Sequence, residues 1–417
     1  MEKKTFLGSI MRGDSWIWGI YWLLFFISVV EMFSASSRLV YKSMTSTDPV
    51  FRHMEFLFWG LGVVLVFQSL NIKAIRNWSI IIYAAGVSFL FALPVFGRSV
   101  NGAVRDVGGL QPAEICKVGL MMALCLAMTA SDEFYYRFSI FRKNVKLYRY
   151  LFYLLIAAIV ALPILTQNLS TALIIGMATI SVLWIGGAKG LYLRRTLYVV
   201  GACGLIGFAA LYGLHEWDNA NAAEGKTLVN LGPINRAHTW ASRVFDKDPI
   251  PLADQTPNDD NAQVIHAHMA LANSYPFGKF IGNSQLRDLL PEAYSDYIYA
   301  IIFEETGFIG ALCVMLLYIV LLGRCFYLAG KTSDPFIRLL MIALPLIMTI
   351  QALMHIGVCT DSMFVTGQPL PLISRGGSSI LLTSVSLGII LALSRLIKAE
   401  REMQEANEVS QVQIESV

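Results

Sequence analysis

Asp296 is one of several ionisable residues that lie in or beside long apolar stretches of this sequence. It stands directly before an apolar run, where two interpretations of a carboxylate are open. Asp296 would be a helix N-cap if its side chain accepted the free N–H groups of the first turn. It would be a general base or a metal ligand if it lay at the mouth of a cavity. The second interpretation makes Asp296 the candidate catalytic residue.

Glu304 and Glu305 lie deeper in the same apolar run. On a straight helix with 3.6 residues per turn, Glu304 would lie about 80° from Asp296 and Glu305 on the opposite face. The two glutamates would therefore not share one cavity with Asp296. Because an ionisable group at membrane depth costs roughly 2.5–3.5 kcal/mol, we expect at least one to pair with a neighbouring helix or to lie near an aqueous cleft. We class both as structural or accessory residues.

Glu114 and Lys117 follow the string Gln111-Pro112-Ala113. A proline early in a helix, with a glutamate in the first turn, is typical of a helix start. Glu114 and Lys117 are three residues apart and would share a helix face. They would form either a local ion pair or a site in which Lys117 contacts a lipid-linked diphosphate and Glu114 orients it.

Ser374, Arg375 and Ser378 belong to a glycine- and serine-rich string, Ser374–Ser379, before the last apolar stretch. Glycines and serines that open a helix beside an arginine can form an anion-binding site. A Gly-Gly turn between two membrane segments explains the same string nearly as well. Both interpretations stay open from the string alone.

Residues that commonly bind metals form no strong motif. His266 and His268 follow Asp259 and Asp260, but no further ligand stands at a defined spacing, so a solvated loop is favoured over a metal site. The six cysteines show no C-x-x-C spacing, which argues against a zinc site and a disulfide framework.

The composition indicates that lipid is the main solvent of the elements that must position these residues. The chain has 417 residues, of which 56% are hydrophobic and 15% are charged, and its mean hydropathy is +0.58. A soluble domain carries about 25% charged residues. The net charge of +3 comes without a long basic run, so nothing points to nucleic acid as a partner.

Ten apolar stretches approach the length of about 20 residues that a membrane-spanning helix needs. They are residues 16–34, 54–71, 77–96, 113–130, 149–166, 169–186, 196–214, 297–322, 336–358 and 379–397. We predict an all-α polytopic membrane protein with a single transmembrane domain over residues 1–397. The first stretch is too long for a signal peptide and is expected to be retained.

The distribution of Lys and Arg predicts that both termini are cytoplasmic. Residues 215–295 would then form a large extracytoplasmic loop between the seventh and eighth helices. A loop of this length in a compact protein is usually functional. Residues 398–417 are charged and lack aromatic residues, and we expect a disordered cytoplasmic tail.

Three of these strings resemble signatures of the SEDS family (shape, elongation, division and sporulation proteins). Leu290–Tyr299, which reads L-P-E-A-Y-S-D-Y-I-Y, and Glu304–Gly307 resemble the family's L-P-E-x-x-[ST]-D-F-I-F…E-E-x-G. Gln111–Lys117 is similar to Q-P-S-E-x-x-K, and Thr366–Ser379 to T-G-x-x-L-P-x-x-S-Y-G-G-S-S. The resemblance covers nearly the whole chain.

The resemblance implies a ten-helix peptidoglycan glycosyltransferase that polymerises lipid II, the undecaprenyl-diphosphate-linked disaccharide-pentapeptide. The family's essential aspartate corresponds to Asp296, and its glutamate and lysine near the outer face correspond to Glu114 and Lys117. Arg243 in the outer loop falls where the family has a similar residue and is expected to bind substrate. Gln351 is expected to be an accessory residue.

The resemblance also implies partners and a location. It allows a divalent metal ion, Mg²⁺ or Mn²⁺, at Asp296 and no organic cofactor. The expected protein partners are a class B penicillin-binding protein, which is a transpeptidase, and other division proteins. The expected location is the bacterial cytoplasmic (inner) membrane at the division septum. A role in division is preferred over one in elongation.

Several positions depart from the family's pattern. Asp106 stands where a tryptophan is usual, the string Gln167–Ala172 lacks the usual acid, Arg375 replaces a common tyrosine, and His355 stands where an asparagine is frequent. These changes affect the expected substrate contacts more than the aspartate.

Two other functions are compatible with the sequence. A transporter of the lipid-linked precursor, or flippase, would depend more on Glu304, Glu305 and His355, which lie deep in predicted helices. A non-catalytic scaffold for division partners would tolerate the loss of the Asp296 carboxylate. Asp296 therefore distinguishes an enzyme from a scaffold.

Overall fold

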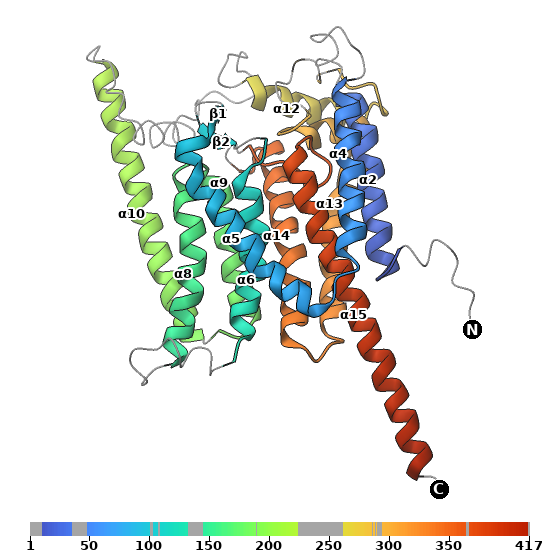
Figure 1. Cartoon of the computed structure of the whole chain (residues 1–417). Coiled ribbons are helices and arrows are strands. Elements are labelled where there is room, and N and C mark those ends of the chain that lie inside the picture. Colours follow the sequence, from blue (N-terminus) through green and yellow to red (C-terminus); the bar gives the residue numbers. More distant parts are fainter. Residues whose placement is uncertain are drawn as a thin grey trace.

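The computed structural model describes residues 11–35, 48–100, 103–106, 109–131, 145–188, 190–223, 262–285, 287, 289, 294–363 and 367–415. Long helices run side by side between two faces of a bundle (Figure 1). They are α2 (Ser15–Ala35), α4 (Asp48–Phe67), α5 (Ile72–Phe96), α6 (Pro112–Thr129), α8 (Val145–Leu165), α9 (Leu169–Ile185), α10 (Gly190–Ala223), α13 (Ile298–Ala329), α14 (Pro335–Cys359) and α15 (Gly377–Glu415).

A short helix and a two-stranded hairpin lie on one face of the bundle, which we call the α12 face (Figure 1). The helix α12 (Ala262–Ser274) lies within the predicted outer loop, so this is the face predicted to be extracytoplasmic. The strands β1 (Arg98–Val100) and β2 (Ala103–Asp106) pair antiparallel between α5 and α6.

The chain is an integral membrane protein. Within the described residues, nine helices are long and apolar enough to cross a membrane, and α9 is an apolar helix of slightly shorter length. These ten helices fall on the ten predicted stretches, and the large loop follows α10, the seventh of them. The predicted all-α fold with nine to ten spans is therefore confirmed.

Local sequence signals begin several of these helices. Asn71 caps α5 by accepting the N–H of Ala74, and Asn168 caps α9 by accepting the N–H of Thr171. Asp334 caps α14, and a proline follows it at the first helical position. The predicted start of α6 at the Gln111-Pro112 step is also found.

The helices α6, α14 and α15 form the centre of the bundle, with most of their spanning residues buried. By contrast, the span of α10 is not buried, and its main packing partner is α9. Because α6 and α14 are central, the polar groups on them are enclosed by protein. This matters for Lys117 and Gln351.

The helix α13 is broken at Gly307, where φ is 69° and ψ is −169°. The segment that follows α12, residues 275–285, fills the break. The backbone N–H groups of Lys279 and Phe280 donate to the carbonyls of Glu304 and Glu305 at 2.9 and 2.8 Å. Phe308 N donates to Pro276 O at 3.0 Å. Backbone groups freed by the break are thus satisfied inside the protein, as a membrane requires.

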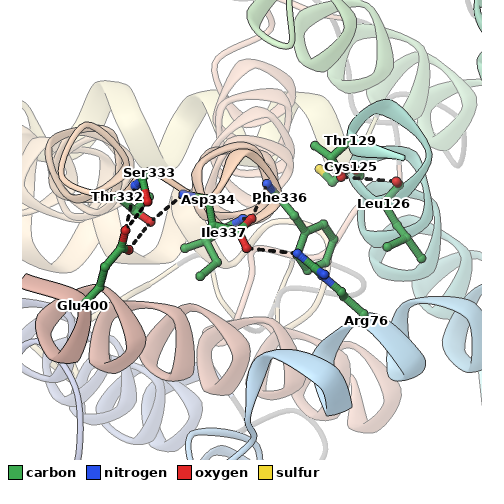
Figure 2. A network of polar contacts seen from close by, with 10 residues as sticks. All are labelled: Arg76, Cys125, Leu126, Thr129, Thr332, Ser333, Asp334, Phe336, Ile337 and Glu400. Carbon is green, nitrogen blue, oxygen red and sulfur yellow. Dashed lines mark hydrogen bonds and ion pairs between the residues drawn. The ribbon is translucent and has the colours of Figure 1, made fainter. Parts of the chain in front are cut away.

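The end of the bundle opposite the α12 face is held by side-chain contacts around the turn between α13 and α14 (Figure 2). Arg76 on α5 pairs with Asp334 at 3.0 Å. Glu400 on α15 accepts hydrogen bonds from Thr332 Oγ1 at 2.6 Å and from Ser333 N at 3.0 Å. These contacts join three distant parts of the chain.

The predicted disordered tail, residues 398–417, differs in the structure. The helix α15 continues to Glu415 and projects beyond the bundle (Figure 1). The physical reason is local. The segment contains neither Gly nor Pro and is rich in Glu, Gln, Ala, Lys and Arg, which favour helices. Ion pairs at i,i+4 add to this, between Lys398 and Glu402 and between Arg401 and Glu405.

Candidate functional site

Asp296 lies in the turn before α13 and is partly exposed. The N-cap position of α13 belongs to Tyr297, so the helix-cap interpretation of Asp296 does not describe this structure. Ser295 Oγ donates to Asp296 Oδ1 at 3.0 Å. Since α13 begins at Ile298, the angles expected for a straight helix through Asp296 do not apply either.

The loop before α15, residues 367–376, packs directly on this turn. Arg375 N donates to Tyr294 O at 2.9 Å, and Ser374 Oγ donates to Ser295 O at 2.7 Å. Ser374 Oγ also accepts from Leu370 N at 2.7 Å. Ser374 is buried, so its hydroxyl links the loop to the turn.

Arg375 places a positive charge beside the turn that holds Asp296. Its guanidinium lies over the ring of Tyr294, with Cζ 5.0 Å from the ring centroid, and the side chain is partly exposed. Stacking of this kind orients a guanidinium without neutralising it. Arg375 can therefore meet an anion beside the turn that contains Tyr294 and Asp296.

The glycines of the Ser374–Ser379 string have a packing role. A Cβ on Gly377 would lie 2.5 Å from the ring of Phe56 on α4, so this close approach requires glycine. Ser378 is buried in the first turn of α15. Among the described members of the string, Arg375 is the charged residue, and its side chain is partly exposed.

Lys117 and Glu114 form a buried ion pair on α6. Lys117 Nζ donates to Glu114 Oε1 at 2.7 Å and to Gln351 Oε1 on α14 at 2.6 Å. Gln351 Nε2 in turn donates to Pro369 O at 2.7 Å. Lys117 is only 3% exposed, and Glu114 is 7% exposed. The ion-pair interpretation thus describes the structure, and Gln351 joins the pair to the loop before α15.

A pocket opens beside Glu114, between the ends of α5, α6, α8 and α9 and the loop before α15. The empty space between its lining residues, together with the open solvent at its mouth, measures about 500 Å³. Its lining residues are Leu93, Gln111, Ala113, Glu114, Ile164, Gln167, Asn168, Thr171, Gly367, Gln368 and Pro369. Most of its polar groups are therefore side-chain amides.

A chain of polar contacts connects this pocket to the Asp296 turn. Gln368 O accepts from His355 Nδ1 at 2.7 Å; because a carbonyl only accepts, His355 carries its proton on Nδ1. His355 Nε2 then faces the thiol of Cys359, one helical turn further on, at 3.7 Å. The Cys359 sulfur also lies 3.9 Å from Asp296 O. The helix α14 thus contacts both the pocket wall and the turn.

Glu304 and Glu305 lie in a different part of the molecule. The Glu304 carboxylate contacts Lys279 Nζ at 2.9 Å, Ser284 Oγ at 2.5 Å and Gln285 N at 3.1 Å. Glu305 accepts a hydrogen bond from Ser34 on α2. These contacts attach the segment after α12, and α2, to the broken helix. The accessory role expected for both glutamates stays a prediction.

Two expected features of the site, substrate binding by Arg243 and a divalent metal ion at Asp296, stay predictions. Arg243 lies outside the described residues. Within the described residues, no group of three or more His, Cys, Asp or Glu side chains could enclose a metal ion. A divalent ion at Asp296 would therefore need ligands from the substrate or from elsewhere in the chain, and its presence stays a prediction.

Gln368 is the residue that sequence reasoning missed. It stands between Gly367 and Pro369 in the string Thr366–Ser379, which the sequence singled out for its resemblance to a SEDS signature. Its Nε2 donates to Thr171 Oγ1 at 2.7 Å, while its buried Oε1 has no hydrogen-bond partner within the described part of the chain. The signal available in the sequence was a polar residue between two turn formers, which does not reveal partners on α9 and α14.

The chain matches the family model of cell cycle proteins that is named for FtsW, RodA and SpoVE, over residues 14–399. A probable peptidoglycan glycosyltransferase FtsW of Tolumonas auensis is 27% identical over 355 residues, which cover 82% of each protein. Stage V sporulation protein E of Bacillus subtilis is 28% identical over 386 residues, which cover 89% of this chain and 94% of that protein.

Solved structures show a similar fold. One is a chain from work described as "Structural coordination of polymerization and crosslinking by a peptidoglycan synthase complex", with a TM-score of 0.66 at 23% identity, covering 92% of this chain and 98% of that one. Another is the rod shape determining protein RodA of Thermus thermophilus, with a TM-score of 0.61 at 21% identity, covering 92% and 97%.

Proposed function

Because the chain belongs to the FtsW/RodA/SpoVE family of cell cycle proteins, we propose that it is a peptidoglycan glycosyltransferase that polymerises lipid II during cell division. One observation carries the site assignment. Asp296 lies in a partly exposed turn on the α12 face, the guanidinium of Arg375 stacks on Tyr294 of the same turn, and α14 connects the turn to a polar pocket.

The proposed reaction uses Asp296 as the general base. A sugar hydroxyl of one substrate attacks the anomeric carbon of the lipid-linked glycan, and its proton passes to the Asp296 carboxylate. The new carbon–oxygen bond forms as the bond to the diphosphate breaks, and undecaprenyl diphosphate leaves with the electron pair. Arg375 offsets the negative charge that develops on the diphosphate. Mg²⁺ or Mn²⁺, if bound at Asp296, would supply further positive charge there.

The topology supports this substrate. The sequence predicts that the α12 face is extracytoplasmic, and Asp296 and Arg375 both lie at that face. A lipid-linked head group could reach them while its tail stays in the membrane. The flippase alternative depends on Glu304, Glu305 and His355, and all three already bond to protein groups.

The partner and the location are proposed from the relatives. The similar solved chain comes from a complex that couples polymerisation and crosslinking, which supports a class B penicillin-binding protein as the partner here. We place the chain in the bacterial cytoplasmic membrane at the septum because the family is described as cell cycle proteins and several of its relatives are named FtsW. Elongation, as in RodA, is the second candidate, since the fold is also similar to that protein.

The experiment compares polymerisation of lipid II by the purified wild type and by Asp296→Asn, each with the cognate transpeptidase and at equal folded concentration. Asn keeps the size of the side chain but is not a base, so we expect a loss of about 10²-fold or more. Adding a metal chelator to the wild type tests the predicted divalent ion in the same assay.

The matched control is Asp361→Asn, the same change at an exposed carboxylate after α14. Its backbone has φ of 52°, a conformation that Asn also tolerates, so the fold should not change. The control should polymerise as well as the wild type. If Asp296→Asn is as active as the control, Asp296 is not the base and the site assignment is wrong.

A further inference from the structure

The pocket beside Glu114 has polar walls with almost no net charge. Gln111, Gln167, Asn168 and Gln368 contribute amides, and Thr171 contributes a hydroxyl. Among the described lining residues, Glu114 is the one that carries a charge. Its carboxylate pairs at 2.7 Å with Lys117, which is not among the lining residues. An anionic ligand would find no uncompensated positive charge among these residues.

Gln368, which lines this pocket, has a buried hydrogen-bond acceptor that is unused among the described residues. The residue is 2% exposed, and none of the described residues forms a hydrogen bond with its Oε1. Two contacts hold it in place, from its Nε2 to Thr171 Oγ1 and from His355 Nδ1 to its backbone carbonyl, both at 2.7 Å. A buried acceptor without a partner is costly, and a ligand O–H or N–H would satisfy it.

The apolar residues of the pocket complete a pattern that suits a sugar. Leu93 and Ile164 are buried residues of the lining and offer a surface for the C–H face of a pyranose ring. Amide groups both donate and accept, as sugar hydroxyls and acetamido groups do. Pockets of this kind use a few fixed polar groups on an apolar wall to set orientation.

We propose that this pocket binds the sugar part of the lipid-linked substrate, and not its diphosphate. The inference rests on the proposed function and adds a division of labour to it. The diphosphate lies toward the partly exposed guanidinium of Arg375, while the buried ammonium of Lys117 shapes the pocket by holding Glu114 and Gln351. This differs from the sequence-based expectation that Lys117 contacts the diphosphate.

The test measures the binding of two lipids to the purified full-length chain in nanodiscs. Lipid II carries the sugars and the diphosphate, whereas undecaprenyl diphosphate carries the same lipid and diphosphate without sugars. Gln368→Met keeps the side-chain length and removes the amide. We expect it to weaken lipid II binding about 5- to 20-fold, the usual effect of losing one or two hydrogen bonds, and to leave undecaprenyl diphosphate binding unchanged.

Three further variants sharpen the result. Gln68→Met makes the same change at a buried glutamine after α4, whose Oε1 accepts from Arg12 N at 3.0 Å, and should alter neither affinity. Arg375→Gln should weaken the binding of both lipids. Thr171→Val, which keeps the side-chain shape, should repeat the selective loss and covers the case in which Gln368→Met does not fold.

The proposal is overturned if Gln368→Met and Thr171→Val weaken both lipids equally or weaken neither. Failure of the proposed function has a different signature: the wild type would bind lipid II but would not polymerise it with its partner present. The two failures are therefore distinguishable in one set of purified proteins.

Discussion

The ion pair between Lys117 and Glu114 constrains the site most strongly at the scale of single residues. Both side chains lie on the central helix α6, and Gln351 provides the second acceptor for the ammonium. A buried pair contributes little net stability when it is complete, but removing one partner leaves an uncompensated charge that costs about 3–5 kcal/mol. The pair is therefore a fixed part of the pocket wall.

Lys117→Met should strongly destabilise the protein, by roughly 3–5 kcal/mol, because Glu114 then loses its partner. The double variant Lys117→Met with Glu114→Gln removes both charges and should recover much of that loss. Thermal unfolding in detergent measures both effects. A single variant as stable as the wild type would contradict the buried pair.

The same variants separate the two roles of Lys117. If the ammonium only shapes the pocket, the double variant should regain part of the lipid II polymerisation that Lys117→Met loses. If Lys117 contacts the diphosphate, polymerisation should stay absent although the fold is restored. Activity and melting temperature therefore need to be read on the same samples.

The break in α13 is the main feature at the scale of elements. Its position depends on Gly307 and on the segment after α12, whose backbone donates to Glu304 O and Glu305 O. The break ends the straight helix near its outer end and lets chain from the large loop pack into it. Since Asp296 precedes this helix, the break is part of what positions the turn.

Gly307→Ala should destabilise the protein by about 1–3 kcal/mol, the usual cost of a non-glycine residue in such a conformation. An added Cβ would lie 2.4 Å from Pro276 O, so the inserted segment must also move. Thermal unfolding and lipid II polymerisation should both decline.

Gly323→Ala, in the same helix, is the matched control because, apart from the adjacent backbone of its own helix, no atom of the described residues lies within 4 Å of its added Cβ. Alanine there should be neutral or stabilising by up to about 1 kcal/mol. Equal effects of the two substitutions would show that the break does not depend on Gly307.

These elements also show what the sequence could predict. The ten spans were predictable because lipid burial demands a continuous apolar stretch, which is a local signal. The break at Gly307 was not, since it depends on pairing with residues 276–280 of a long loop. The role of Gln368 was equally hidden, because its partners Thr171 and His355 come from α9 and α14.

At the scale of the whole molecule, the two ends of the bundle are built differently. The α12 face holds the pocket and the Asp296 turn, whereas the opposite end is held by charged contacts. There Arg324 on α13 pairs with Asp14 before α2 at 2.6 Å. Figure 2 shows Glu400 on α15 bonded to the turn between α13 and α14. Both α13 and α14 therefore run from the end of the bundle held by these contacts to the end that carries the site.

Glu400→Ala should lower stability by about 1–2 kcal/mol, because the turn loses its hydrogen bonds from Thr332 and Ser333 to the carboxylate. Removing residues 406–417 should leave stability unchanged, since this part of α15 projects beyond the bundle (Figure 1). Glu402→Ala is the point-mutation control, because Glu402 is exposed and its Lys398 pair spans 3.9 Å.

Polymerisation of lipid II by Glu400→Ala, measured below its melting temperature, should match the wild type. Its contacts lie at the far end of α14 from His355 and Gln351, so the pocket and the Asp296 turn keep their own bonds. A loss of activity without a loss of stability would mean that the contacts of Glu400 affect the geometry of the site through α13 and α14. Unchanged activity with a lower melting temperature would show that α15 secures the bundle and that the α12 face alone performs the chemistry.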